Sequence, residues 1–148
     1  MNQYTPTASG EKIIQTMIEL ARCSKLHRII VAGSKSLHHM FELHSRGYNR
    51  VVTGMTYGLQ RGRYDVGFLD WRLQQIKAIE AKLDWLVPLL APTSVLVIWL
   101  DASEREDHQK VRSILVRLGF RVEAGTCCED GLAISARRRD ANQQAMAA

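Results

Sequence analysis

The residues with the clearest chemical potential form a turn, Gly33-Ser34-Lys35-Ser36, between an apolar run and a helix-like pattern. Backbone amides at the start of a helix attract anions, and this turn adds two hydroxyl groups and one cationic side chain. It therefore predicts a site for a small anionic ligand, a phosphate or a carboxylate. The turn is not a P-loop, because the four-residue gap between the first glycine and Gly-Lys-Ser is absent. In the plainer alternative, Ser34 or Ser36 only caps the helix and Lys35 is solvated.

A second candidate pair, Asp70 and Trp71, ends another apolar run. Ligands of open α/β sheets bind at the carboxyl ends of the strands, so this pair is predicted to share an edge with the turn. The indole of Trp71 can stack on a planar ring. In the alternative interpretation, Asp70 caps a helix that begins at Arg72, and Trp71 packs beneath that helix.

Histidines and cysteines give weaker signals. Three histidines and a glutamate lie close together: His38, His39, Glu42 and His44. His38 and Glu42 are four residues apart and His39 and Glu42 three apart, a spacing that places either pair on one helical face. No second cluster supplies the remaining ligands, so we expect surface or half-buried histidines and no metal site. Cys23 and the adjacent Cys127 and Cys128 have no metal-ligand spacing, which favours reduced thiols. No G-x-S-x-G elbow supports a nucleophilic serine.

The elements that must position these residues alternate along the chain. The sequence predicts helices over 10–24 (capped by Ser9), over 36–46, over about 72–90 with a bend or end at Pro88, and from a capping box at Ser103 and Glu106 to Gly119. It predicts strands over 27–32, 50–55, 64–70 and 94–101, and a hairpin over 120–138 around a turn at 129–131. This order indicates an α/β fold: a three-layer Rossmann-like sandwich with a mostly parallel sheet of about six strands and a C-terminal antiparallel hairpin.

Length and composition are typical of one globular domain. The chain has 148 residues, of which 46% are hydrophobic and 24% charged. We expect a domain over 10–139 with flexible ends at 1–9 and 140–148. No apolar window approaches the length of a membrane span, and no secretory signal is evident, so a cytoplasmic protein is predicted.

The net charge of +5 raises the question of nucleic acid. Much of the basic excess lies at Arg61, Arg63 and the triplet 137–139, while acidic residues offset the rest. A solvated basic surface is therefore favoured over a nucleic-acid site.

From His27 to Arg138 the chain resembles class I S-adenosylmethionine-dependent methyltransferases, in a divergent and shortened form. The segment "RIIVAGS" matches the first strand and loop of that family, and "YDVGFLDW" matches its "FDxVxLD" strand. The segments "LDWLVPLLAPTSVLVIWLD" and "LVRLGF" match "L…LLxPGGxLVI" and "LxxxGF". The resemblance implies this fold and makes S-adenosylmethionine a possible cofactor.

The functional motifs of the family are degenerate here. In its "D/E-x-G-x-G-x-G" loop, Val31 takes the acidic place and Gly33 keeps one glycine place, while Lys35 and Leu37 occupy the others. Met55 stands where the second strand of the family ends in an acid that grips the ribose. A dinucleotide oxidoreductase is disfavoured by the same missing glycines and acid.

The chain is also shorter than the family between its second and third strands. Thr56–Arg63 replaces a helix, an edge strand and a second helix, so a direct crossing over the sheet is predicted. The adenine-side wall of the pocket would then be lost.

Two functional hypotheses follow. The favoured one is a divergent methyltransferase-like domain that serves as a non-catalytic binding or assembly module. The alternative is an atypical methyltransferase of unknown substrate. Candidate cofactor-binding residues are Gly33, Ser34, Lys35, Ser36, Met55, Asp70 and Trp71; no catalytic residue is assigned.

The lost segment also predicts self-association. It would leave an open sheet edge and apolar surface near Tyr48, Val52 and Tyr57, which a homodimer would cover. In the competing arrangement, helix 10–24 folds over the gap and the protein stays monomeric.

Overall fold

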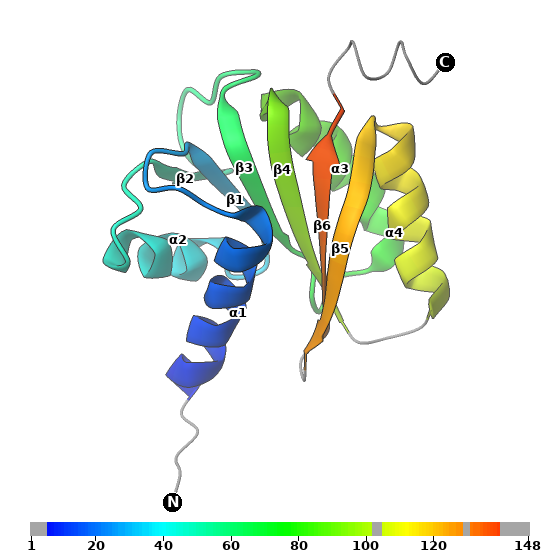
Figure 1. Cartoon of the computed structure of the whole chain (residues 1–148), viewed down its shortest axis with the longest axis horizontal. Coiled ribbons are helices and arrows are strands. Elements are labelled where there is room, and N and C mark those ends of the chain that lie inside the picture. Colours follow the sequence, from blue (N-terminus) through cyan, green and yellow to red (C-terminus); the bar gives the residue numbers. More distant parts are fainter. Residues whose placement is uncertain (1–5, 102–104, 129–130, 140–148) are drawn as a thin grey trace, which may run out of the picture.

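The structure, a computed structural model, describes residues 6–101, 105–128 and 131–139. Within these residues the chain forms four α-helices and six strands, and helices separate most of the strands along the sequence (Figure 1). The helices are α1 (Pro6–Ala21), α2 (Ser36–Ser45), α3 (Ile79–Leu86) and α4 (Arg105–Arg117), and two short 3-10 helices, η1 (Ile76–Ala78) and η2 (Val87–Leu89), flank α3. The strands are β1 (Ile29–Gly33), β2 (Val51–Thr53), β3 (Tyr64–Asp70), β4 (Leu90–Leu100), β5 (Phe120–Cys128) and β6 (Gly131–Arg138).

One sheet joins all six strands in the order β2-β1-β3-β4-β6-β5. The strands β2, β1, β3 and β4 run parallel to one another, whereas β6 pairs antiparallel with both β4 and β5. The predicted mostly parallel sheet with a C-terminal hairpin is confirmed. β2 is an edge strand of three residues, so no further strand lies beyond it in the described sheet.

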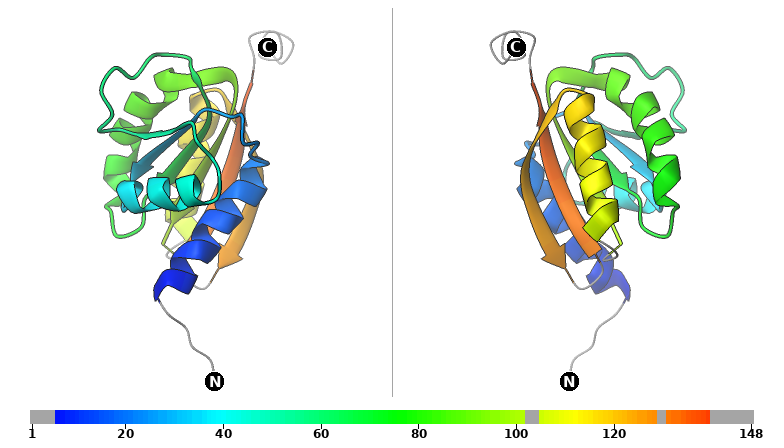
Figure 2. Two further views of the ribbon diagram at one scale, coloured as in Figure 1. Left: turned by 90° about the vertical axis from the view of Figure 1, so that its left-hand side faces the viewer. Right: turned by 90° about the vertical axis from the view of Figure 1, so that its right-hand side faces the viewer.

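Helices cover both faces of the sheet (Figure 2). On one face α1 and α2 bury Ile14, Met17 and Leu43 against the sheet. On the other face α3 and α4 bury a second apolar cluster, which includes Leu83 and Ile114. β4 contributes side chains to both clusters, because successive side chains of a strand point to opposite faces. Leu96, Ile98 and Leu100 belong to the cluster under α3 and α4, and Val95, Val97 and Trp99 belong to the cluster under α1 and α2. The three-layer prediction is confirmed.

The crossing from β2 to β3 is direct, over residues 54–63. Leu59 on this segment packs against the cluster that α3 and α4 cover. The chain therefore passes over the α3 face of β1, at a place where most α/β crossovers carry a helix.

Two predicted helices differ from the structure. α1 begins at Pro6 and ends at Ala21, so it starts before the predicted cap position Ser9. The predicted helix over 72–90 begins only at Ile79, because distant partners take the amides that would start it. Trp71 N–H donates to the Trp99 carbonyl, and Leu73 N–H donates to the Asp101 carboxylate. Leu73 also adopts a left-handed conformation, with φ of 63°, and Pro88 lies in η2 before β4 starts at Leu90.

Some predictions fall outside the described residues: the capping residue Ser103, the turn residues 129 and 130, the tail 140–148, and the first five residues of the segment 1–9. Among the residues that the structure does describe, no helix combines the length and apolarity needed to cross a membrane.

Candidate functional site

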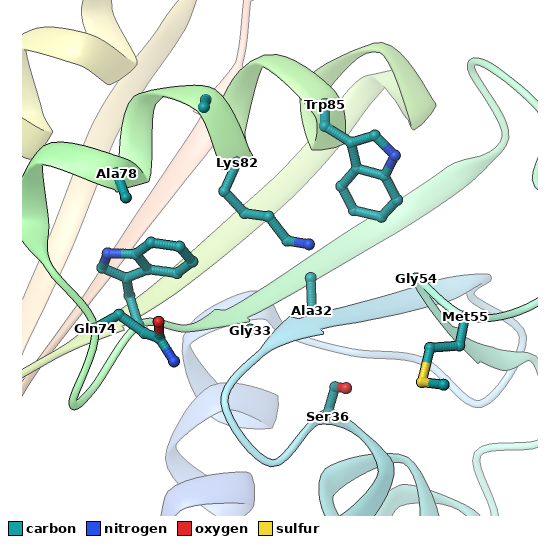
Figure 3. A pocket seen from close by; sticks show the side chains of 11 residues that line it. Ala32, Gly33, Ser36, Gly54, Met55, Gln74, Ala78, Lys82 and Trp85 are labelled. Carbon is teal, nitrogen blue, oxygen red and sulfur yellow. The ribbon is translucent and has the colours of Figure 1, made fainter.

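The carboxyl ends of β1, β2 and β3 meet at one edge of the sheet, and the predicted site residues lie there. A cleft of about 680 Å³ opens between this edge and α3 (Figure 3). Gly33, Ser36, Met55 and Trp71 are among the residues that line it. A smaller hollow of about 220 Å³ lies beside it and includes Ser34 and Lys35 in its lining. The structure thus divides the predicted turn between two hollows.

The turn is fastened to the end of β3. Gly33 has φ of +86°, and a Cβ atom there would lie 2.2 Å from the Asp70 carbonyl oxygen, so the position requires glycine. Ser34 N–H donates to that carbonyl at 2.7 Å, and the Ser34 hydroxyl donates to the carbonyl of Arg72 at 2.7 Å. Lys35, in a left-handed conformation, occupies the cap position of α2 without a side-chain cap. Neither serine therefore caps the helix, and the Ser34 amide is already engaged, which removes one donor from the predicted anion site.

Asp70 is fully buried and belongs to a charge network instead of the cleft wall. The Arg72 guanidinium donates to both Asp70 carboxylate oxygens, at 2.9 and 2.8 Å, and His39 Nε2 donates to one of them at 2.8 Å. Burial raises the pKa of Asp70, but the hydrogen bonds from Arg72 and His39 and the charge of Arg72 outweigh it and hold that pKa below its ordinary value. Asp70 is therefore ionised at neutral pH, and it caps no helix at Arg72.

His39 corrects a sequence prediction, because it is 1% exposed and not a surface or half-buried histidine. His39 and Leu43 are the buried residues of α2, and their spacing of four places them on its inner face. The Nε2 hydrogen goes to Asp70, and Nδ1 has no partner among the described residues. That helical spacing was the one sequence signal for its burial.

Two aromatic side chains and one lysine shape the cleft. Trp71 is 8% exposed, packs in the core layer beneath α3, and donates its indole N–H to the Gln75 carbonyl at 3.0 Å. Trp85 is 38% exposed and lies against Gly54, where an added Cβ would come within 2.9 Å of the ring. Lys82 Nζ lies 4.4 Å from the centre of the Trp85 ring. Figure 3 shows Lys82 extending from α3 toward Ala32 at the end of β1.

Sequence reasoning missed Lys82 and Trp85. Both lie inside the predicted long helix, outside the apolar stripe that predicts it. Their spacing of three residues puts them on one face of α3, and that spacing was the available signal. Met55, by contrast, is 80% exposed at the rim of the cleft.

Metal and thiol chemistry have little support within the described ranges. No group of three or more histidine, cysteine, aspartate or glutamate side chains there can hold a metal ion. Burial raises the pKa of the Cys23 thiol to about 12, so this thiol is protonated at neutral pH and is a poor nucleophile.

Many solved structures share the fold of this chain. No protein-family model matches the chain, and neither does any curated protein. The cyclase SpnF is 10% identical over 95% of this chain and 84% of its own, with a TM-score of 0.64. The Burkholderia thailandensis 1,6-didemethyltoxoflavin-N1-methyltransferase is 12% identical over 91% and 82%, with a TM-score of 0.61. The magnesium protoporphyrin IX methyltransferase of Synechocystis is 14% identical over 93% and 86%, with a TM-score of 0.57.

These likenesses show the fold and not the activity, because all three identities are far below 25%. The chain has a class I methyltransferase-like fold in a divergent form, as its motifs predicted. One of these three neighbours is a cyclase by name, so the fold is not confined to methyl transfer.

The cleft does not fit S-adenosylmethionine well. That cofactor carries a positively charged sulfonium, and an acid at the end of the second strand would grip its ribose. Among the described residues, the charged side chain that lines the cleft is Lys82, while Trp85 lies against Gly54. The second strand ends at Thr53 and not at the predicted residue 55, so Met55 follows β2 in a turn. The nearby acid, Asp70, is buried and neutralised by Arg72. No acidic group in the described lining balances a cationic ligand.

Proposed function

We propose that this domain is a non-catalytic binding module with a methyltransferase-like fold, and that its cleft binds a small planar anion instead of S-adenosylmethionine. The observation that carries this proposal is the placement of Lys82 and Trp85 on one face of α3, above a cleft whose described lining has no acidic side chain. A cleft of about 680 Å³ is large enough for a small organic molecule.

The chemistry of the lining supports this ligand class. An indole face offers apolar area to a planar ring, and Trp71 and Trp85 both contribute to the lining. The ammonium of Lys82 extends into the cleft and complements a carboxylate, a sulfonate or a phosphate. Ser36 adds a partly exposed hydroxyl at the start of α2.

Calorimetry with naphthoate, a planar aromatic carboxylate, tests the proposal, with uncharged naphthalenemethanol as the matched ligand. We expect naphthoate to bind more tightly, and Lys82→Met to weaken its binding about tenfold, because a hydrogen bond to a charged group contributes about 1.5 to 3 kcal/mol. Lys77→Met, at an exposed lysine outside the described lining, is the control. Equal binding of the two ligands, or equal losses in the two variants, would contradict the proposal.

The second candidate is an atypical S-adenosylmethionine-dependent methyltransferase that uses Gly33, Asp70 and Trp71. It is favoured by the neighbours, since the Burkholderia structure holds S-adenosylhomocysteine and the Synechocystis structure holds the methyl donor. Thermal unfolding with millimolar S-adenosylmethionine distinguishes the candidates. A ligand at about 100 times its dissociation constant adds about 2.7 kcal/mol to the free energy of unfolding. Such a gain would favour the enzyme and overturn the proposal that the cleft binds a planar anion instead of S-adenosylmethionine.

A further inference from the structure

A second hollow lies at the opposite edge of the sheet, at the amino ends of β1, β2 and β3. Its volume is about 360 Å³. Three arginines line it, and each precedes a different strand: Arg28 before β1, Arg50 before β2 and Arg63 before β3. Asn49 and Gln60 add amide groups to the lining. Parallel pairing brings the starts of these strands together, so residues far apart in sequence deliver cations to one place.

These three guanidinium groups form no ion pair among the residues that the structure describes. Other arginines of the described chain form ion pairs, as Arg46 does with Glu42 and Arg72 does with Asp70. Within the described residues, no carboxylate pairs with Arg28, Arg50 or Arg63. The neighbouring acid, Asp65, accepts the backbone N–H of Arg28 at 2.9 Å and is not part of the described lining. Gathering unpaired like charges costs Coulomb energy, which a bound anion would offset.

The backbone that carries the arginines is held in place. The carbonyl of Arg28 accepts N–H groups from Asp65 and Val66, and the carbonyl of Arg50 accepts the Ile29 N–H at 2.8 Å. Arg63 N–H donates to the Leu89 carbonyl at 3.0 Å. The hollow is therefore built on strand ends whose backbone is already fixed, so little backbone freedom is lost when a ligand binds there.

The arrangement of the arginines selects among anions. A nucleic-acid strand presents one charge about every 3.4 Å and is followed by an extended basic groove. Here three arginines line one hollow, and Arg61, two residues from Arg63, is outside its described lining. Guanidinium groups bind phosphate oxygens in pairs of parallel hydrogen bonds. A compact ligand with several phosphate charges matches this geometry.

We infer that the amino-edge hollow is a binding site for a compact oligophosphate of the pyrophosphate class. It is separate from the carboxyl-edge cleft and does not depend on the function proposed for that cleft. Arg50 and Arg63 hold the ligand from the edge strand and from the start of β3, and Arg28 holds it from the strand between them.

Titration calorimetry with inorganic pyrophosphate tests the inference, at constant ionic strength and without divalent metal. We expect the wild-type chain to bind, and Arg50→Gln and Arg63→Gln each to weaken binding about tenfold. Arg61→Gln removes the same charge from the same loop and is expected to change the affinity less than about twofold. Melting of each variant without ligand checks that these exposed substitutions leave the fold intact.

Three results would overturn the inference. No binding at millimolar pyrophosphate would show that the hollow is only a solvated basic surface. Equal losses for Arg61→Gln and Arg63→Gln would show general electrostatic attraction. Tighter binding of a short single-stranded oligonucleotide than of pyrophosphate, weakened by all three variants, would show a nucleic-acid surface.

Discussion

Asp70 carries a charge in a fully buried position, so its contribution to the free energy of unfolding depends on its hydrogen-bond and ion-pair partners. Removing one partner of a buried ion pair leaves the other charge uncompensated, which costs about 3 to 5 kcal/mol. Asp70→Asn leaves the Arg72 guanidinium without its carboxylate and replaces an acceptor for His39. We therefore expect this substitution to lower the free energy of unfolding by about 3 to 5 kcal/mol at pH 7, measured by urea titration. Asp84→Asn, at an exposed position, is the control and is expected to cost less than about 0.5 kcal/mol.

The pH dependence of this difference follows from the lowered pKa of Asp70. A carboxylate whose pKa is lower in the folded chain stabilises the fold above its unfolded pKa, near 3.8, and loses that effect as pH falls through the folded value. The gap between wild type and Asp70→Asn should therefore be full at pH 7 and narrow below about pH 3.8. An equal gap at neutral and acidic pH would show that the loss comes from packing and not from charge.

At the scale of the elements, β4 joins the two core layers, so it should be the costliest place to open a cavity. Leu96 is fully buried between the sheet and the α3–α4 layer. Leu96→Ala is expected to cost about 2 to 5 kcal/mol, because a buried cavity adds to the lost transfer free energy. Val116→Ala removes an exposed side chain from α4 and should cost less than about 0.5 kcal/mol. A loss of that small size at Leu96 would contradict a central position for β4.

The sequence predicted those elements whose causes are local. β3 spans Tyr64–Asp70 as predicted, because its apolar run and its end are both encoded within the segment. α3 was placed too early, because the amides before it bond to Trp99 and Asp101, which lie 28 residues along the chain from Trp71 and Leu73.

The same distinction between local and distant causes applies to the site. Its location at the carboxyl edge was predictable from strand order, since the turn and Asp70 each end a strand. The pairing of His39 with Asp70 joins residues 31 positions apart and has no local signature. The packing of Trp85 on Gly54 depends on where α3 lies after a direct crossing, which the apolar pattern of the helix does not encode.

For the whole molecule, the predicted exposed apolar surface is only partly present. Tyr48 is 7% exposed, since its ring packs in the α1–α2 layer beneath the ammonium of Lys25. α1 contacts α2, β4 and β6. Met55 and Tyr57 remain 80% and 99% exposed beside that edge. The open edge and two adjacent apolar side chains still favour a dimer.

Self-association through β2 is therefore the expectation at this scale. A two-fold axis at the edge would pair one protomer with its partner through a single self-complementary patch. Light scattering over a hundredfold range of concentration should give a mass that rises toward twice 16.8 kDa. Tyr57→Ser should shift this rise to higher concentration, because it removes exposed apolar area at the edge, whereas Val116→Ser, on α4 at the other face, should not. A constant mass near 16.8 kDa would show that the three-residue edge strand is too short to recruit a partner.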